Sequence, residues 1–411
     1  MLIISNKNFS KLWFSQSVSL IGDQIFLLAL PLMVYAINKS GFEMATTYAF
    51  GMLPFLVFSF IGGGLSDLYS KKSILIFGNL FSAIPLGILL YLKYSSVLAP
   101  WHIYSINFVL SCIAALVMPA WESSIPQIVA RPDLVEANSF TEVSVTGSQL
   151  IGPGLSGFLI GAFGADLSIL LNAVSFVACG ILVYYIQFSD FGVAKNPSKK
   201  CSFKIQTQNI LKNILSGIQY VPRHKILRWG VFLSTFGNIV LGAYGALLIF
   251  NMSERLKMSP AAIGVFTSVT TVVPIVFSIF ISKKLAQVLS RGKLMILGSF
   301  FQGIGVCLVG FSENIYSLAA AQSLYLLAIT NFQINWKSLR QEITPAHLIG
   351  RVSGACRAIA YTGASVGAFV SSALINQLNA NSMFVVQGLL IASVALLVGI
   401  WSPLRLNVGD N

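Results

Sequence analysis

The amino-acid sequence predicts an all-α membrane protein whose twelve transmembrane helices form two related bundles of six. Its composition, the lengths of its apolar runs and a repeat between its halves support this prediction. Hydrophobic residues make up 55% of the 411 residues and charged residues only 9%, whereas a soluble domain carries about 25% charged residues. A soluble fold cannot bury so much apolar surface, because part of every such fold faces water. We therefore expect lipid to surround most of the chain.

Twelve apolar runs are long enough to cross a bilayer, which takes about 20 residues in a helix. They cover residues 12–37, 43–65, 73–93, 101–121, 138–163, 167–188, 228–252, 260–283, 293–312, 315–336, 350–376 and 381–403. Scattered Gly and Pro and the lack of sustained alternation disfavour a membrane β-barrel. The first run lacks the short apolar core and small-residue cleavage site of a signal peptide, so we expect it to stay as an anchor.

The distribution of basic residues predicts the orientation of the chain in the membrane. With the N-terminus in the cytoplasm, 21 of the 26 Lys and Arg residues fall on the cytoplasmic side and 4 on the outer side, while Arg357 lies inside a run. Such a bias is the positive-inside signature, and it predicts that both termini are cytoplasmic. The net charge of +13 then reflects topology and contact with anionic lipids, and it does not indicate binding to nucleic acid.

A hydrophilic stretch at 189–227 divides the chain into an N-terminal bundle at 1–188 and a C-terminal bundle at 228–411. Within this basic linker, Ile205, Ile210 and Ile214 recur at helical spacing, which is typical of an amphipathic helix on the inner leaflet. The alternative is a solvated linker with incidental apolar residues.

The two halves match weakly but repeatedly at a shift of 215 residues. Gly22-Asp23 in the first run meets Gly237-Asn238 in the seventh, and Trp121 meets Trp336. Two related six-helix halves joined by a basic loop are the plan of many secondary transporters, whose substrate site lies near the membrane midplane between the halves.

The loop between the second and third runs carries a recognisable motif, Gly64-Leu65-Ser66-Asp67 followed by Lys71-Lys72. It resembles a cytoplasmic-loop signature of the major facilitator superfamily, which implies a gating role for Gly64, Asp67, Lys71 and Lys72. The glycine allows close helix packing, the aspartate can cap the next helix, and the lysines suit helix C-termini and lipid phosphates. Leu68 and Ser70 replace the arginine and glycine of the usual pattern.

Further motifs resemble the branch of that superfamily that contains enterobactin exporters and macrolide efflux proteins. They are Pro119 to Pro126, Arg131 to Asn138, Gly152 to Gly157, Arg340 to Pro345, and Gly350 to Val352. The resemblance implies a monomeric, proton-coupled exporter in the bacterial cytoplasmic (inner) membrane, acting by alternating access. Its cargo would be a small amphipathic molecule, either a siderophore-like metabolite or a macrolide-type drug. Gly152 and Pro153 also resemble an exporter signature and would let one bundle rock on the other.

Asp23 is the candidate proton-coupling residue, because it lies near the middle of the first apolar run. A charge at that depth costs at least a few kcal/mol unless it is paired, hydrated or protonated. The alternative is an aspartate that is hydrogen-bonded to a neighbouring helix and never titrates. Asn238, its counterpart, would bind substrate or accept a hydrogen bond from protonated Asp23. The helical face expected to line a cavity with Asp23 contains Gln16, Leu20, Leu27 and Leu30.

Two charged residues related by the same shift, Glu142 and Arg357, are candidates for a gating salt bridge, although each could instead snorkel to the interface. Glu122 could bind a cationic substrate or carry a second proton, and is otherwise an interfacial acid. The resemblance implies a substrate cavity formed by the first, fourth, seventh and tenth helices, although each residue could equally serve packing. The candidate substrate-binding residues are Gln16, Asn107, Glu122, Asn238, Tyr244, Gln322, Tyr325, Gln333 and Trp336.

Other function classes find little support in the sequence. The five cysteines and three histidines are isolated from one another, so neither a metal site nor a cofactor is expected. The lack of a P-loop argues against ATP hydrolysis by this chain. Uptake of a nutrient or flipping of a lysolipid by the same fold stays open. An enzyme or a non-transporting scaffold is disfavoured, because no catalytic constellation is visible.

Overall fold

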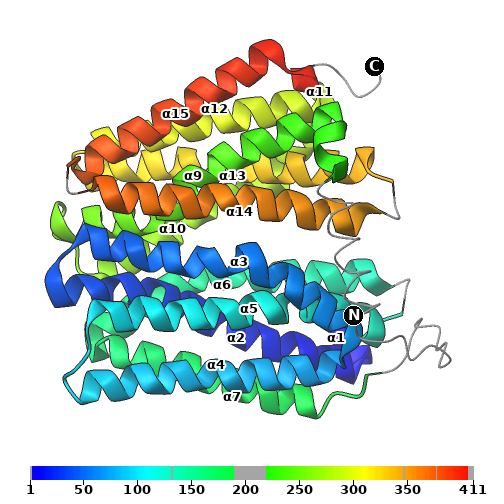
Figure 1. The fold of residues 1–411 in the computed structure, drawn as a ribbon, viewed down its shortest axis with the longest axis vertical. Helices are drawn as coiled ribbons and strands as arrows, with labels where there is room; N and C mark the ends of the chain where they lie inside the picture. The colour runs from blue at the N-terminus through cyan, green and yellow to red at the C-terminus, as the bar shows by residue number, and fades with distance from the viewer. Residues whose placement is uncertain (1, 131–132, 189–218, 346–347, 376, 406–411) are drawn as a thin grey trace. The chain divides into compact units, whose positions relative to one another are not determined.

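The computed structural model describes residues 2–130, 133–188, 219–345, 348–375 and 377–405, and within these ranges the chain forms helices and no strands (Figure 1). The predicted all-α fold class is confirmed. The elements are α1 (Leu2–Ser5), α2 (Lys7–Asn38), α3 (Gly41–Leu68), α4 (Lys71–Tyr94), α5 (Pro100–Ile128), α6 (Leu134–Phe163), α7 (Ala165–Tyr184), α9 (Lys225–Glu254), α10 (Pro260–Phe280), α11 (Ser282–Val288), α12 (Arg291–Phe311), α13 (Ile315–Ile343), α14 (Ile349–Leu374), α15 (Ala380–Trp401) and η3 (Pro403–Arg405).

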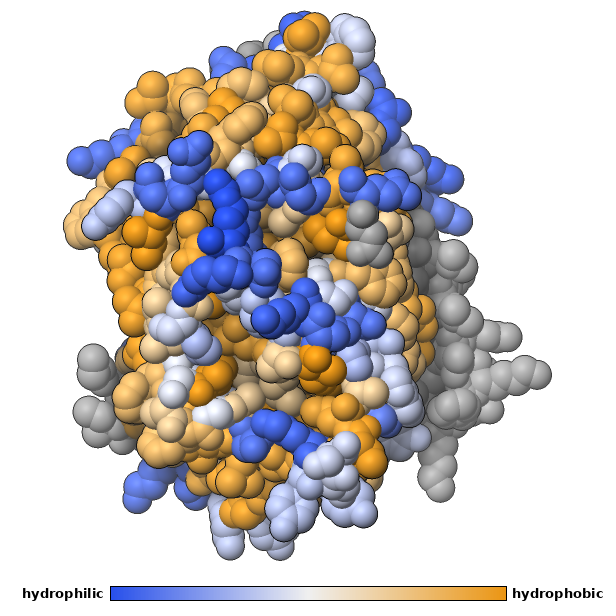
Figure 2. Space-filling model, turned by 90° about the vertical axis from the view of Figure 1, so that its left-hand side faces the viewer, coloured by the Kyte–Doolittle hydropathy of each residue, from blue (hydrophilic) through white to orange (hydrophobic). Residues whose placement is uncertain are grey.

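Among the described residues, 11 helices are long and apolar enough to cross a membrane. The remaining predicted span, 350–376, coincides with the 26-residue α14, which carries Arg357 and many small residues. Figure 2 looks onto the end at which α2 ends and α3 begins, where hydrophilic residues are interspersed with hydrophobic ones. The chain is thus a multi-pass membrane protein, while the cytoplasmic location of its termini stays a prediction.

Packing divides the chain into two compact units. The first contains Met1–Asn38, Val57–Ile210 and Ser259–Ser268, and the second contains Lys39–Leu56, Leu211–Met258 and Val269–Asn411. The start of α3 therefore packs with the second unit, and the start of α10 packs with the first. The predicted boundaries at 188 and 228 stay a prediction, and most of the expected amphipathic helix, 189–218, lies outside the described residues.

In the first unit, α2 packs against α6 and α7, and α4 packs against α5 and α7. In the second unit, α12 packs against α13 and α15, while α9 packs against α14 and α15. One helix in each half begins with the same kind of serine cap. Ser70 caps α4 by accepting from the Ser73 N–H, and Ser290 caps α12 by accepting from the Lys293 N–H. Such caps satisfy amides that the first helical turn leaves unpaired.

Lysines bind the C-terminal end of α7. Lys72 Nζ donates to the Ile186 carbonyl at 2.8 Å and lies 5.5 Å from the centre of the Tyr184 ring. Lys11 Nζ donates to the Tyr185 carbonyl at 3.2 Å. A cation is favourable there because a helix C-terminus carries partial negative charge. Lys72, predicted to act in gating, thus joins the start of α4 to the end of α7 in this structure, while Lys11 joins α2 to the same end.

Replacing Lys72 with alanine is therefore expected to destabilise the first unit by about 0.3–1 kcal/mol, because the end of α7 loses one of its two cations. The loss would appear as a lower thermal midpoint of the purified protein in detergent. Lys71→Ala is the matched control, since Lys71 makes no hydrogen bond or ion pair with the described residues. Equal effects of the two substitutions would contradict this assignment.

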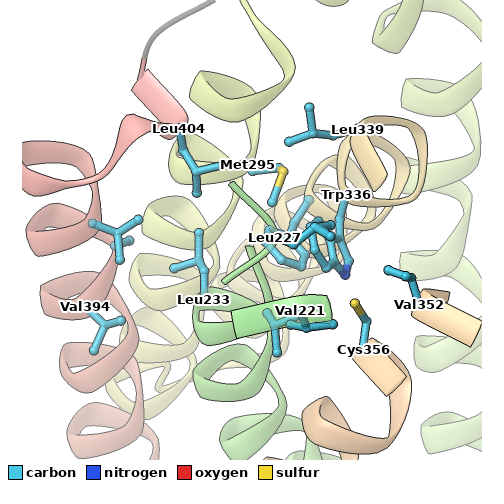
Figure 3. Close-up of a cluster of buried hydrophobic side chains, with 14 of the residues drawn as sticks. Val221, Leu227, Leu233, Met295, Trp336, Leu339, Val352, Cys356, Val394 and Leu404 are labelled. Atoms are coloured by element: carbon cyan, nitrogen blue, oxygen red, sulfur yellow. The ribbon is translucent and has the colours of Figure 1, made fainter. Parts of the chain in front are cut away.

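The second unit has a hydrophobic cluster in which the residues around the start of α9 meet the C-terminal η3 (Figure 3). Val221 and Leu227 pack there with Trp336, Cys356 and the C-terminal Leu404, each at most 7% exposed. The Trp336 ring covers Gly230, where an added Cβ would lie 2.2 Å from Cζ3. Trp336, a predicted substrate-binding residue, therefore belongs to the core of its unit in this structure.

Truncation of Trp336 to alanine is expected to destabilise the protein by about 3–5 kcal/mol, the usual cost of deleting a buried large aromatic side chain. Its helix also provides a control, Gln333→Ala, because Gln333 is exposed. Thermal midpoints of the two variants should differ clearly. If Trp336→Ala unfolded at the wild-type temperature and only substrate binding weakened, Trp336 would be a ligand residue after all.

Candidate functional site

The middle of α2 meets α7 along a seam of small and polar residues. Ser15, Ser19 and Gly22 lie on the α2 side, with Asn172 and Ser175 opposite on α7, and all four polar side chains are at most 5% exposed. A Cβ added to Gly22 would lie 2.4 Å from Ser175 Oγ and 2.6 Å from Asn172 Oδ1. Small residues at such contacts let helix backbones approach closely within a membrane. The seam therefore places the amide of Asn172 directly beside the α2 backbone.

Asp23 lies at the edge of this seam. Its carboxyl interacts with the side chain of Asn172 and, at longer range, with the Cys179 thiol. On the face predicted to line a cavity, Gln16, Leu20 and Asp23 are partly exposed and Leu27 is 46% exposed, whereas Leu30 is buried. The structure thus places Asp23 between a buried polar seam and the open face of α2. An acid in such a position can be held from one side and reached by protons from the other.

Helix α6 covers α2 next to Asp23. A Cβ added to Gly152 would lie 2.3 Å from Cβ of Gln24, and Ser156 Oγ donates to the Ile25 carbonyl at 2.7 Å. Closer to the start of α6, the Ser17 and Ser144 hydroxyls are 2.7 Å apart. The Gly152-Pro153 motif therefore lies against the residues that directly follow Asp23.

The same segment of α6 also touches α10. The Gly154 N–H donates to Ser268 Oγ at 2.8 Å. A Cβ added to Gly157 would lie 2.4 Å from the Pro260 carbonyl oxygen and 2.9 Å from Cα of Gly264. Within the first unit, the motif thus links the helix of Asp23 to the start of α10. Ser268 is a contact that sequence reasoning missed.

The second unit contains a helix contact equivalent to that of Gly152, but it has no acid at the position equivalent to Asp23. Gly367, the counterpart of Gly152, packs on Ile239, whose carbonyl oxygen would lie 1.9 Å from an added Cβ. The amide of Asn238, the counterpart of Asp23, donates to the Ser234 carbonyl of its own helix at 2.8 Å. Only the first of the two equivalent positions therefore carries an ionisable side chain.

Three predicted substrate-binding residues come together in the second unit. The Tyr244 hydroxyl donates to Gln322 Oε1, and the Tyr244 and Tyr325 rings stack with centroids 4.2 Å apart. These side chains are only 3–6% exposed. In this structure the group joins α9 to α13, an arrangement that matches the packing alternative for these residues.

The remaining candidates do not gather at one place within a unit. Asn107 is partly exposed, and Glu122 and Gln333 are exposed. Glu142 and Arg357 are both exposed and belong to different units, so their pairing stays a prediction. Gly64 and Asp67 lie in α3, but their immediate surroundings fall outside the described residues. In the ranges that the structure describes, no three His, Cys, Asp or Glu side chains are grouped as metal ligands would be.

Sequence reasoning missed Asn172 and Ser175, which form the polar side of the Asp23 site. A signal for Asn172 was present, because it is an amide in the apolar run 167–188 and falls 215 residues before another intramembrane amide, Gln387. The Nε2 atom of Gln387 donates to Ser371 Oγ at 2.7 Å. Both halves therefore place an amide at the equivalent point of their sixth helix.

Comparison with known proteins supports one family. The family described as "Transmembrane secretion effector" matches residues 3–410. The multidrug efflux pump Tap of Mycolicibacterium fortuitum is 22% identical over 380 residues, which cover 88% of each chain. The enterobactin exporter EntS of Escherichia coli O1:K1 is 22% identical over 373 residues, which cover 89% of this chain and 85% of EntS. A solved POT family transporter in complex with 5-aminolevulinic acid is similar in fold, with a TM-score of 0.77 at 12% identity over 97% of this chain and 96% of that chain.

Proposed function

Because this chain belongs to the transmembrane secretion effector family of major facilitator transporters, we propose that it exports a small amphipathic organic molecule in exchange for protons. The cargo class is a siderophore-like metabolite or a macrolide-type drug. Transport proceeds by alternating access, with the halves at 1–188 and 228–411 moving against each other around the cargo. The chain acts as a monomer in the bacterial inner membrane, and its basic linker contacts anionic lipids.

The position of Asp23 is the observation that carries the proposed coupling. An ionisable group within a membrane-spanning helix is costly and marks a functional site by default. Asp23 combines a polar partner on α7 with a partly exposed face on α2, which are the two features that a proton carrier needs. Its counterpart in the second half is the uncharged Asn238, so coupling is assigned to the first half.

The contacts of α6 suggest how protonation of Asp23 reaches other helices. Gly152 packs beside Gln24, and Gly154 and Gly157 contact α10. A small shift of α2 on protonation would therefore be passed to α10 through one close-packed segment. We assign the predicted gate pair, Glu142 and Arg357, to the cytoplasmic side.

The direction of transport is proposed from the names of two relatives, an efflux pump and an exporter. Deletion of the gene in its native host, followed by comparison of small molecules in cells and spent medium with and without iron, tests it. Export predicts that one metabolite disappears from the medium, accumulates inside, and returns to the medium with the wild-type gene. Loss of a metabolite from cells instead would indicate uptake. Changed lysolipids between the membrane leaflets would indicate a flippase. If no metabolite changes, susceptibility of the deletion strain to macrolides tests drug efflux.

A further inference from the structure

Neither the oxygen nor the nitrogen of the Asn172 side chain makes a good hydrogen bond in this structure. Ser175 Oγ lies 2.8 Å from the Asn172 backbone carbonyl and 3.2 Å from Asn172 Oδ1. A hydroxyl donates only one hydrogen, and the shorter contact to the backbone takes it. Oδ1 and Oγ are then two acceptors in contact without a proton between them. At the other end of the amide, the buried Nδ2 has no well-aligned acceptor among the described residues.

Rotating the amide by half a turn exchanges its oxygen and nitrogen. Nδ2 would then face Ser175 Oγ and donate to it, which removes the contact between the two acceptors. Oδ1 would then replace Nδ2, the atom that Asn172 directs toward the Asp23 carboxyl in this structure. An amide oxygen repels a carboxylate but accepts a hydrogen bond from a protonated carboxyl. One orientation of Asn172 therefore suits ionised Asp23, and the opposite orientation suits protonated Asp23.

We propose that Asn172 is the positioning residue for the Asp23 proton, and that its amide reverses each time Asp23 gains or loses that proton. The inference rests on the proposed role of Asp23 and adds a partner on α7. Ser175 is the third member, because its hydroxyl accepts from Asn172 only in the protonated state. The three groups form a two-state element within the first unit.

The other groups around Asp23 are distant or uncharged, so the positioning role is assigned to Asn172. On α7 the titratable groups nearest to Asn172 are Asp166, which pairs with Lys93, and Cys179, about 9 Å and 10 Å away along the axis. Helix α6 presents Gly152 and Ser156 at this level. Glu142 lies ten residues before Gly152 on α6, or about 15 Å along the axis. The nearest lysine on α2, Lys11, is about 18 Å away by the same rise per residue.

The remaining neighbours are equally distant or carry no charge. The start of α2 meets the end of α5, where Asn6 Nδ2 donates to the Ile128 carbonyl. From this contact, Asp23 lies about 25 Å along α2 and Glu122 only about 9 Å along α5. Helix α1 contains no titratable side chain. No charged side chain of α1, α5, α6 or α7, the helices that pack on α2 within the first unit, therefore lies at the depth of Asp23.

Infrared spectroscopy of the full chain in proteoliposomes tests the proposal without a known cargo. The carboxyl C=O band that Asp23→Asn removes is followed as a function of pH in each variant. Ser175→Ala should lower the midpoint of this band by about half a unit to one unit, because the protonated state loses one neutral hydrogen bond. Asn172→Leu removes the amide from both states and should raise the midpoint, because the hydrogen bond to the ionised acid is the stronger of the two that are lost. Ser82→Ala, which removes a buried hydroxyl on α4, should leave it unchanged.

The outcomes separate this inference from the function on which it rests. If the band titrates but Ser175→Ala leaves its midpoint at the wild-type value, or if both variants shift it in the same direction, the reversal of Asn172 is refuted while proton coupling stands. If the Asp23 band does not titrate, the proposed coupling itself fails. Should Asn172→Leu not fold, as judged by size-exclusion chromatography, the Ser175→Ala result decides alone.

Discussion

Replacement of Asp23 by asparagine is expected to abolish proton-driven transport without loss of folded protein. Exchange of one proton per cargo molecule supports about a tenfold concentration ratio for each unit of pH difference, and the variant should support none. The neutral amide has nearly the same shape and avoids the cost of a charge within the membrane, so the thermal midpoint should equal or exceed that of the wild type. Everted vesicles with an acidified lumen and a labelled macrolide, or the metabolite found by gene deletion, provide the measurement.

The matched control for this experiment is Asp166→Asn. Asp166 is an acid of the same size on α7, but its side chain is 57% exposed and pairs with Lys93. It should retain accumulation at the wild-type level. Full pH-driven accumulation by the Asp23→Asn protein would eliminate Asp23 as the coupling residue and leave Glu122, the other candidate acid, to be tested next.

Introduction of a single methyl group at Gly367 is expected to destabilise the second unit strongly. The added Cβ would lie 1.9 Å from the Ile239 carbonyl oxygen and 2.5 Å from the carbonyl carbon. Both are backbone atoms of α9, so relief requires α9 and α14 to separate along their contact. We expect a loss of stability on the order of 3 kcal/mol, the upper part of the usual range for overpacking. Fluorescence-detected size-exclusion chromatography over a temperature series measures it.

Gly354→Ala is the control on the same helix. A Cβ at Gly354 meets nothing within 4 Å, and alanine is a better helix former than glycine by about 1 kcal/mol. This variant should be as stable as the wild type or more so. Gly367→Ala protein that matches Gly354→Ala in yield and thermal midpoint would show that α9 and α14 do not pack as described.

The fold could be predicted from the sequence because a long apolar chain can adopt only a few kinds of structure in lipid. Backbone groups must be satisfied within each segment, so apolar runs of sufficient length become helices. The repeat could also be predicted, because Gly22-Asp23 and Gly237-Asn238 stand at the same shift of 215 residues as Trp121 and Trp336. The division of α3 and α10 between the two units could not be predicted, because it depends on which helices pack together in the folded protein.

The site was only partly predictable for the same reason. Asp23 was visible as a lone acid in an apolar run, but its contact with Asn172 depends on the rotation of α2 against α7. Tyr244, Gln322 and Tyr325 were selected because polar groups in apolar helices often bind ligands. Polar side chains within a membrane also bond one another across helices, and the buried Tyr244–Gln322 hydrogen bond follows that alternative.

The cluster around Trp336 also bears on when the second unit can form during synthesis. Leu404 is only 2% exposed within this cluster, and its carbonyl oxygen covers Gly292, where an added Cβ would lie 1.9 Å away. A ribosome adds about 5–20 residues per second from the N-terminus, so Leu404 emerges after every described membrane helix of the second unit. The second unit cannot complete its core until Leu404 has emerged, whereas the contacts of α2 with α6 and α7 in the first unit can form well before. A nascent chain stalled before Leu404 should therefore resist protease in its first six membrane helices and be cleaved in the later ones.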